Sequence, residues 1–225
     1  MFYYNLILLF IFGLIVGSFL SVVVGRLETG ESIFKGRSMC PKCKKKIRYH
    51  DLVPVFSFLV LKGRCRECQK KISLFYPIIE ILTGLVFAFL YWRFHMSFIE
   101  ADYWLFFITS ILVISSLIAI FFYDLFYSIV PDKIVLPISL VVLVLALINI
   151  VFKLDFFVYQ PSLVNLVLGI IFGAGIFLAL VLVSKEKWMG WGDVKLGFLL
   201  GVFLGYPLIL VALFFAFIIG TVVSA

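Results

Sequence analysis

Long, uninterrupted apolar runs separated by short polar segments dominate the chain. The runs are continuous rather than alternating, which is typical of membrane helices and not of the strands of a transmembrane barrel. The sequence therefore predicts an all-α fold, a polytopic transmembrane helical bundle. The expected apolar helices, most of them long enough to cross a bilayer, are 5–24, 75–92, 104–123, 131–152, 163–184, 194–205 and 207–225.

Two parts of this pattern leave alternatives open. The last two runs flank Pro207 and fit either one bent segment or two helices. The apolar run 52–61 contains Pro54 and is too short to span a bilayer. We therefore interpret it as an interfacial segment or as one packed under the surrounding loop.

Composition and charge give the bundle an orientation. The chain has 225 residues, 64% of them hydrophobic, and a mean hydropathy of +1.22, which excludes an ordinary soluble domain. Its net charge is +7, and 13 of its 19 Lys and Arg residues lie between Arg26 and Lys71. Such a basic loop could bind nucleic acid, but in a membrane protein the positive-inside rule is the simpler explanation, and it makes the loop cytoplasmic.

The first helix is predicted to stay in the mature protein. Residues 1–25 contain no Lys or Arg, so the basic n-region of a signal peptide is missing. Arg26 follows the apolar run directly, so this helix has its N-terminus outside and its C-terminus inside. Continuing the alternation places the loop 93–103 outside and a second basic cluster, 185–187, inside.

All four cysteines lie in the basic loop, as the pairs Cys40-Pro-Lys-Cys43 and Cys65-Arg-Glu-Cys68. Two such pairs, 21 residues apart, are typical of a four-thiolate zinc site, because each pair supplies two sulfurs from one tight turn. Four protein ligands leave zinc no open position for a substrate, so we expect a structural ion.

Other interpretations of the cysteines remain open. Two disulfides are the first alternative, although thiols in a cytoplasmic loop stay reduced. An iron–sulfur cluster is the second. His50 is a further candidate ligand that the spacing does not require. With zinc as the expected ion, the chain divides into a first transmembrane helix (1–24), a small cytoplasmic zinc-binding loop (25–74) and a transmembrane core (75–225).

Three carboxylates, those of Asp124, Asp132 and Asp193, fall where predicted spans meet the cytoplasm. Each has a simple interpretation as an interfacial charge, and Asp132, directly after Pro131, fits a first-turn residue that interacts with the helix dipole. Ionisable residues at membrane depth are costly, however, and tend to be functional. Two carboxylates held together share a proton, so one acts as base and the other as acid, which is aspartyl protease chemistry.

The neighbours of Asp193 favour that interpretation. Gly190 and Gly192 permit backbone conformations that other residues resist, and they let a substrate strand approach closely. A nucleophilic enzyme finds no support, because neither His50 nor His95 lies beside a credible serine and no cysteine is left over from the zinc set.

Glycines also recur every fourth residue, a spacing that lets helix backbones approach closely in a membrane. The predicted packing ridges are Gly13 with Gly17, Gly169 with Gly173, and Gly197 with Gly201 and Gly205.

Short motifs along nearly the whole chain match one family in order. They are Gly17–Val23 (GSFLSVV), Arg37–Cys43 (RSMCPKC), Asp51–Ser57 (DLVPVFS), Gly63–Cys68 (GRCREC), Ile72-Ser73, Tyr76–Glu80 (YPIIE), Asp124–Asp132 and Gly190–Lys195 (GWGDVK). With Ser21 where asparagine is usual, the chain resembles the bacterial prepilin peptidases. These form the type IV leader peptidase/N-methyltransferase family, a group of GxGD-type membrane aspartyl proteases.

The resemblance implies a bifunctional enzyme of the bacterial inner membrane. It would cleave the basic leader from prepilins or pseudopilins, its partners in the membrane, at the cytoplasmic face. It would then methylate the new N-terminus with S-adenosylmethionine. Carried over by motif, Asp124 and Asp193 are the catalytic pair and Asp132 is non-catalytic. The motifs do not locate the methyl-donor site, for which Glu80 is a guess.

The resemblance also bears on the end of the chain and on the partners. The family usually continues with a Pro-Phe-Gly segment and a last helix, whereas this chain stops inside an apolar stretch at Ser224-Ala225, as a truncated core would. No nucleic-acid partner is expected. Two alternatives are a transporter that uses paired aspartates as a proton relay, which predicts acidic residues near the bilayer midplane, and a non-enzymatic zinc-loop scaffold, which predicts no dependence on the aspartates.

Overall fold

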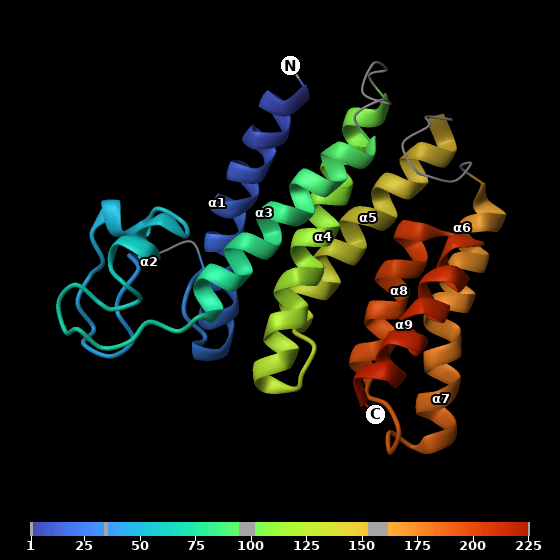
Figure 1. Cartoon of the computed structure of the whole chain (residues 1–225). Helices are drawn as coiled ribbons and strands as arrows, with labels where there is room; N and C mark the ends of the chain where they lie inside the picture. Colours follow the sequence, from blue (N-terminus) through green and yellow to red (C-terminus); the bar gives the residue numbers. More distant parts are fainter. Residues whose placement is uncertain (1, 34–35, 95–101, 153–161, 225) are drawn as a thin grey trace. The chain divides into compact units, whose positions relative to one another are not determined.

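The computed structural model describes residues 2–33, 36–94, 102–152 and 162–224, and these are helical apart from their connections (Figure 1). The long helices are α1 (Phe2–Thr29), α3 (Phe75–Phe94), α4 (Asp102–Tyr127), α5 (Asp132–Phe152), α8 (Trp191–Leu204) and α9 (Leu208–Ser224). A further continuous helical segment consists of α6 (Leu163–Ile170), the π-helical turn η3 (Ile171–Gly175) and α7 (Ile176–Ser184). Two short elements, η1 (Tyr49–Leu52) and α2 (Phe56–Val60), lie between α1 and α3.

The prediction of an all-α, multi-pass membrane protein is confirmed. Among the described residues, five helical segments are long and apolar enough to cross a membrane: Phe2–Thr29, Phe75–Phe94, Leu105–Tyr127, Asp132–Phe152 and Leu163–Ser184. Around Pro207 the chain forms two helices, α8 and α9, rather than one bent segment, because Gly205 has a φ of +63° and ends α8.

One predicted boundary differs in a way that matters for the site. The expected span 104–123 stops before Asp124, whereas α4 continues to Tyr127. Ser128, with a φ of +54°, ends the helix, and Pro131 precedes α5. Asp124 therefore lies in the last helical turn of α4. Asp132 is the first residue of α5, as the sequence predicted for a first-turn residue.

The chain forms two compact units, which are described separately. The first contains Met1–Phe98 and Leu117–Phe126, and the second contains Ile99–Ser116 and Tyr127–Ala225. The expected division at residues 24 and 74 follows chain order and stays a prediction. The residues His95 and Glu100, placed outside the membrane by the sequence, lie outside the described residues.

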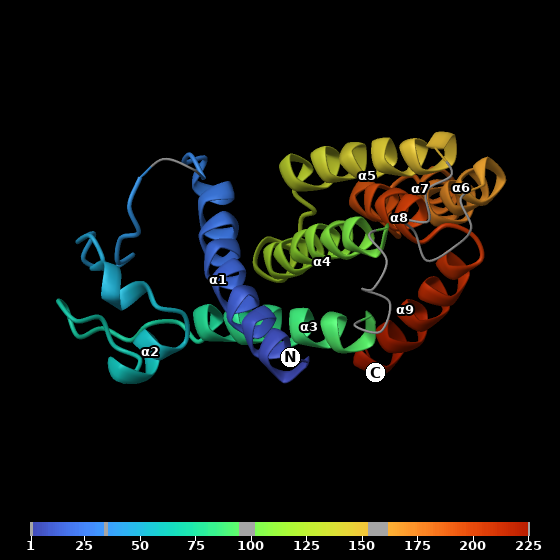
Figure 2. The ribbon, with the colours of Figure 1, turned by 90° about the horizontal axis from the view of Figure 1, so that it is seen from above.

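In the first unit, α1 packs against α3, as both ribbon views show (Figures 1 and 2). The contact depends on two glycines, because a Cβ built on Gly13 would lie 2.7 Å from Gly84 Cα, and one built on Gly17 would lie 2.7 Å from Glu80 Cα. These distances are shorter than any side chain tolerates, so the predicted packing ridge on the first helix is confirmed.

In the second unit, α8 contacts α5, the α6–η3–α7 segment and α9. Gly169 and Gly173 face Gly201 and Gly197, and any Cβ on one of these four would collide with backbone atoms of its partner helix. The predicted glycine ridges are confirmed here too. Asp193 stands at the start of this tightly held helix.

Candidate active site and metal centre

The two cysteine pairs form two turns of the same backbone geometry. In the first turn the N–H of Cys40 donates to the carbonyl oxygen of Lys45, and in the second the N–H of Cys65 donates to that of Lys70, at 3.0 and 2.9 Å. Each turn is closed by one antiparallel bridge between its flanks. Residues 39–46 and 64–71 are thus a structural repeat that the sequence analysis missed, although the repeated CxxC motif was its visible signal.

The residue after each pair completes the turn. Lys44 and Gln69 adopt left-handed φ angles of +58° and +56°, and their N–H groups donate to the carbonyl oxygens of Cys40 and Cys65. This bend turns both thiols of a pair to the same side. Neither position is a glycine, so a strained backbone is held at both turns.

The four thiols meet at one point. The Sγ atoms of Cys40, Cys43, Cys65 and Cys68 all lie within 4.8 Å of one another, and those of Cys40 and Cys68 are 3.9 Å apart. Four sulfurs at zinc–sulfur distances of about 2.3 Å from one tetrahedral centre would be separated by about 3.8 Å. The thiols are free, and their arrangement fits a tetrahedral metal ion.

The electrostatics of the cluster favour partial ionisation. Burial raises the pKa of the Cys40 thiol, but hydrogen bonds from backbone N–H groups and from neighbouring thiols outweigh burial and bring that pKa to about 7. At Cys68 the backbone N–H of Lys70 lowers the pKa, yet burial and the other thiols together raise it to about 11. The cluster therefore carries one readily formed thiolate, and a bound cation would draw off the remaining protons.

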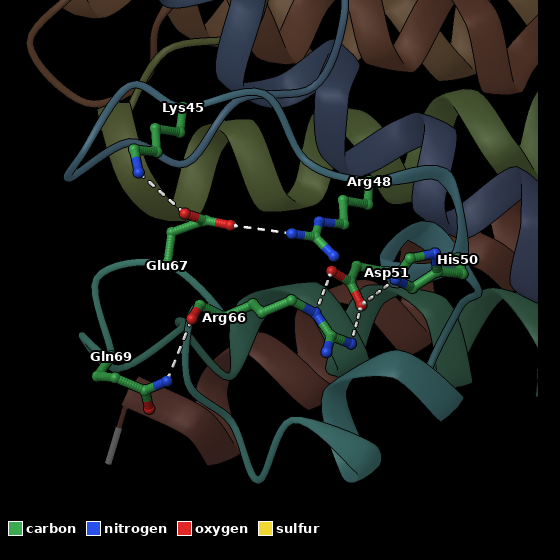
Figure 3. Close-up of polar contacts among 7 residues, drawn as sticks. All are labelled: Lys45, Arg48, His50, Asp51, Arg66, Glu67 and Gln69. Carbon is green, nitrogen blue, oxygen red and sulfur yellow. Dashed lines mark hydrogen bonds and ion pairs between the residues drawn. The ribbon is translucent and has the colours of Figure 1, made fainter.

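Ion pairs connect the two cysteine turns (Figure 3). Glu67, inside the second pair, accepts from Lys45 at 2.9 Å and lies 3.5 Å from Arg48, both in or next to the first turn. Asp51, only 7% exposed, accepts two bonds from the Arg66 guanidinium, at 2.9 Å from Nε and 2.7 Å from Nη2. This paired fork holds the second turn against η1.

His50 belongs to this network rather than to the thiol cluster. Its Nε2 lies 3.6 Å from a carboxylate oxygen of Asp51, and the group of side chains positioned to hold a metal consists of the four cysteines. The arginine fork lowers the pKa of Asp51, with a smaller contribution from His50. The metal-ligating candidates in the described residues are therefore the four thiols.

A cavity of about 590 Å³ lies between the cysteine turns and the adjoining ends of α1 and α3. Its size falls within the range of about 300–1,000 Å³ that is usual for small-molecule sites. Ser18 and Arg26 of α1, Cys40 and Cys65 of the turns, and Glu80 of α3 are among its lining residues. The arginine is already engaged, because its guanidinium donates to four loop carbonyl oxygens.

Asp124 is exposed at the end of α4, in the first unit. Its neighbours anchor the helix end. Tyr123 is buried and its hydroxyl donates to Glu28 of α1 at 3.1 Å, while the Phe126 ring packs edge-on against Phe75 of α3, with centroids 5.0 Å apart. The last turn of α4 therefore presents its carboxylate from a rigid support.

Asp193 is half-buried in the first turn of α8, in the second unit. Gly190 has the extended backbone of an N-cap residue, and Asp193 N–H donates to its carbonyl oxygen at 3.3 Å. A Cβ built on Gly192 would lie 2.6 Å from Cγ2 of Val130. The second glycine of the GxGD motif is thus needed because any side chain there would collide with Val130, in the segment that joins α4 to α5.

Asp132 has a different environment, which the sequence analysis missed. Its carboxylate accepts from the Lys195 ammonium at 2.5 Å, and the two side chains are 55% and 31% exposed. Both belong to motifs quoted above, so the pair links the start of α5 to the first turn of α8 within the second unit. The ion pair makes Asp132 a structural contact of the GxGD helix.

Two family profiles match the chain in succession. Residues 11–94 match the bacterial peptidase A24 N-terminal domain, and residues 111–225 match the type IV leader peptidase family. The second match alone covers half of the chain, and together the two span both compact units.

Several characterised proteins named prepilin leader peptidase/N-methyltransferase are similar to this chain. That of Myxococcus xanthus is 33% identical over 97% of the chain, which covers 62% of that protein. That of Neisseria gonorrhoeae is 33% identical over 95% of the chain and 79% of the relative. That of Bacillus subtilis is 32% identical over 97% of the chain and 81% of the relative. No solved structure matches the chain.

Proposed function

The chain belongs to the type IV leader peptidase family, and we propose that it is an aspartic endopeptidase that cleaves the basic leader from type IV prepilins or pseudopilins. Its second activity is methylation of the new N-terminal residue, with S-adenosylmethionine as the methyl donor. The observation that carries the proposal is the ordered match of both family profiles and of the aspartate motifs at helix ends. Relatives with these names give the transporter and scaffold alternatives no support.

The residues proposed for the two activities lie in different parts of the chain. The chain covers 62% of the first relative's length, so the activity of that whole protein is carried over here as part of the proposal. The peptidase profile lies on residues 111–225, which contain all three candidate aspartates. The thiol cluster and the cavity lie in the N-terminal profile.

Asp124 and Asp193 are the proposed catalytic pair. In the ionised form one carboxylate activates a water molecule, and the protonated partner donates to the scissile carbonyl oxygen, so the pair needs to hold one proton between its two groups. The protons leave such a pair in two steps that belong to both groups. Asp132 is assigned a non-catalytic role, because its carboxylate is engaged by Lys195.

The proposed location is the bacterial inner membrane, with the cysteine turns and both catalytic carboxylates on the cytoplasmic side. The support is the excess of Lys and Arg in the segment between α1 and α3. The proposed metal is structural zinc, held by the four thiolates of residues 40, 43, 65 and 68. It would supply a crosslink between the two turns rather than a reacting centre.

The test is a cleavage assay in membranes that contain the full chain and a prepilin with a basic leader. Wild type is expected to shorten the substrate at one bond after the leader. Asp124→Asn and Asp193→Asn are each expected to lower the rate by about a hundredfold or more, because general acid–base catalysis supplies factors of this size. Asp132→Asn serves as the matched control and is expected to retain cleavage. Equal loss in all three variants would refute the assignment of the pair.

A further inference from the structure

The carboxylate of Glu80 is a buried acid of the N-terminal part that takes no part in the proposed peptidase chemistry. The residue is 7% exposed, lies in the second turn of α3 and lines the cavity described above. Its neighbour in the helix contact is Gly17, which has no side chain and lets α1 pass directly over Glu80 Cα. The side chain is therefore held at the cavity wall.

The other buried acid at this cavity is already neutralised, but Glu80 is not. Asp51 has an arginine fork, and the more exposed Glu67 pairs with Lys45 and Arg48. Within the described residues Glu80 has no ion pair, and its partners are the backbone N–H of Val55, 2.7 Å from Oε2, and the Ser18 hydroxyl. A buried carboxylate needs a proton or a cation, so the wall at Glu80 is suited to a positively charged group, although ten Lys and Arg residues line the cavity as a whole.

The backbone at the Glu80 contact is strained. Val55 has φ +60° and ψ −49°, a region that β-branched residues rarely enter. The residue follows Pro54, and its N–H is turned toward the carboxylate of Glu80, which accepts from it. Strained conformations persist where the surroundings over-determine them, commonly at binding sites. This is a second sign, independent of charge, that the cavity wall is built for a ligand.

We propose that this cavity binds an organic cation of the methyl-transfer reaction, with Glu80 as its counter-charge. The inference rests on the proposed function and adds a site and a residue to it. Two sources share this chemistry: the α-ammonium group of the cleaved pilin, and the sulfonium and ammonium groups of the methyl donor. Both are cations attached to larger bodies, and apolar side chains such as those of Phe58 and Leu61 line part of the cavity.

The Glu80 carboxylate can also accept the proton that the pilin N-terminal ammonium has to lose before methyl transfer. An N-terminal ammonium group has a pKa near 8, so it is mostly protonated at neutral pH and has no free lone pair. Transfer of its proton to the Glu80 carboxylate leaves a neutral amine. The amine nitrogen then forms the new bond to the methyl carbon while the carbon–sulfur bond of the donor breaks, and that electron pair stays on sulfur. Charge and atoms balance without another reactant.

Glu80→Gln tests the proposal, because glutamine keeps the shape and can still accept from Val55 while it loses the charge. The full-length variant is assayed with one prepilin substrate for both cleavage and the mass of one added methyl group. We expect methylation to fall by about tenfold or more, as for a buried charge pair that loses one partner, and cleavage to stay within a few-fold of wild type. Glu31→Gln, an exposed acid at the same cavity, is the matched control.

A binding measurement separates the two sources of the cation. S-adenosylmethionine is titrated calorimetrically into detergent-solubilised wild type and Glu80→Gln. Weaker binding by the variant identifies the donor as the cation, whereas unchanged binding with lost methylation identifies the pilin ammonium. Methylation and binding equal to wild type in Glu80→Gln would overturn the inference and leave the peptidase proposal untouched. A wild type that does not cleave prepilin would instead refute the proposed function.

Discussion

The cysteine turns and the helices around α8 are held together in opposite ways. The turns, residues 39–46 and 64–71, are joined by polar contacts: ion pairs, an arginine fork and a cluster of thiols. The helices around α8 are held by close backbone packing, because the glycines at their contacts have no side chains to keep the helices apart. The first kind of contact can be removed by chelation or acid, whereas the second responds only to added volume.

The difference suits the environments of the two regions. A segment proposed to lie outside the bilayer has too little apolar surface to form a core of its own, so charge pairs and a thiol cluster able to hold a metal take its place. Within the bilayer, burial of apolar groups does not drive helices together, and close packing of small residues does. The cysteine turns can therefore form a wall of the charged cavity proposed for methyl transfer. The tightly packed α8 can hold the carboxylate of Asp193 in a fixed position.

Metal removal should have the largest effect on the cysteine turns. Structural zinc contributes about 10–16 kcal/mol to the folding of small zinc domains, far more than any single ion pair. We expect a chelator, or the substitution Cys40→Ser, to release the metal and unfold the turns while the helices around α8 stay folded. Metal analysis and site-resolved hydrogen exchange check this. An equal loss of hydrogen-exchange protection in the cysteine turns and in the helices around α8 would contradict the claim that the two regions are stabilised separately.

Added volume should break the helices around α8 and leave the turns intact. Gly173→Ala places a Cβ against the backbone of α8, and such overpacking costs about 1–3 kcal/mol. Gly175→Ala, in the same π-helical turn, is the control, because its nearest atom would be 3.9 Å away. Thermal unfolding in detergent measures both. Equal destabilisation by the two variants would show that close packing is not the cause.

Acid should weaken the cysteine turns by a smaller amount. Arg66 holds the pKa of Asp51 below its ordinary value, so this carboxyl is more acidic in the folded than in the unfolded protein. The stability from the pair is therefore complete above the ordinary pKa of about 3.9 and is lost as the pH falls through the lower, folded value. Hydrogen exchange of the turns of wild type and Asp51→Asn between pH 7 and about pH 3 checks this, and the variant should lack the acid dependence.

Much of the fold could be predicted from the sequence, because each segment that crosses a bilayer has to be a long apolar helix. Apolar runs predicted the helices, and fourfold glycine spacing predicted which helices touch. The end of α4 could not be predicted, because Asp124 looks like a polar stop while Tyr123 and Phe126 continue the helix through tertiary contacts. Hydropathy does not register such contacts.

The site was predictable where its residues form motifs and obscure where they pair across the fold. The spacing of the cysteines predicted the cluster. The glycines beside Asp193 were expected to admit a substrate strand, but Gly190 has ordinary extended backbone and Gly192 is crowded by the side chain of Val130. The bond from Lys195 to Asp132 and that from Val55 to Glu80 join residues 63 and 25 positions apart, so no local pattern reveals them. The motifs give Glu80 only as a guess for methyl transfer, and its burial in the cavity wall supports that role as a proposal.

The central claim is that Asp124 and Asp193 act as one catalytic pair, and a double-mutant cycle on prepilin cleavage tests it most directly. Residues that act as a unit are strongly non-additive. We expect Asp124→Asn, Asp193→Asn and the double variant to lose activity to about the same extent, while each keeps the thermal stability of wild type. Retained cleavage in either single variant, or a double variant whose loss is the product of the two single losses, would contradict the claim.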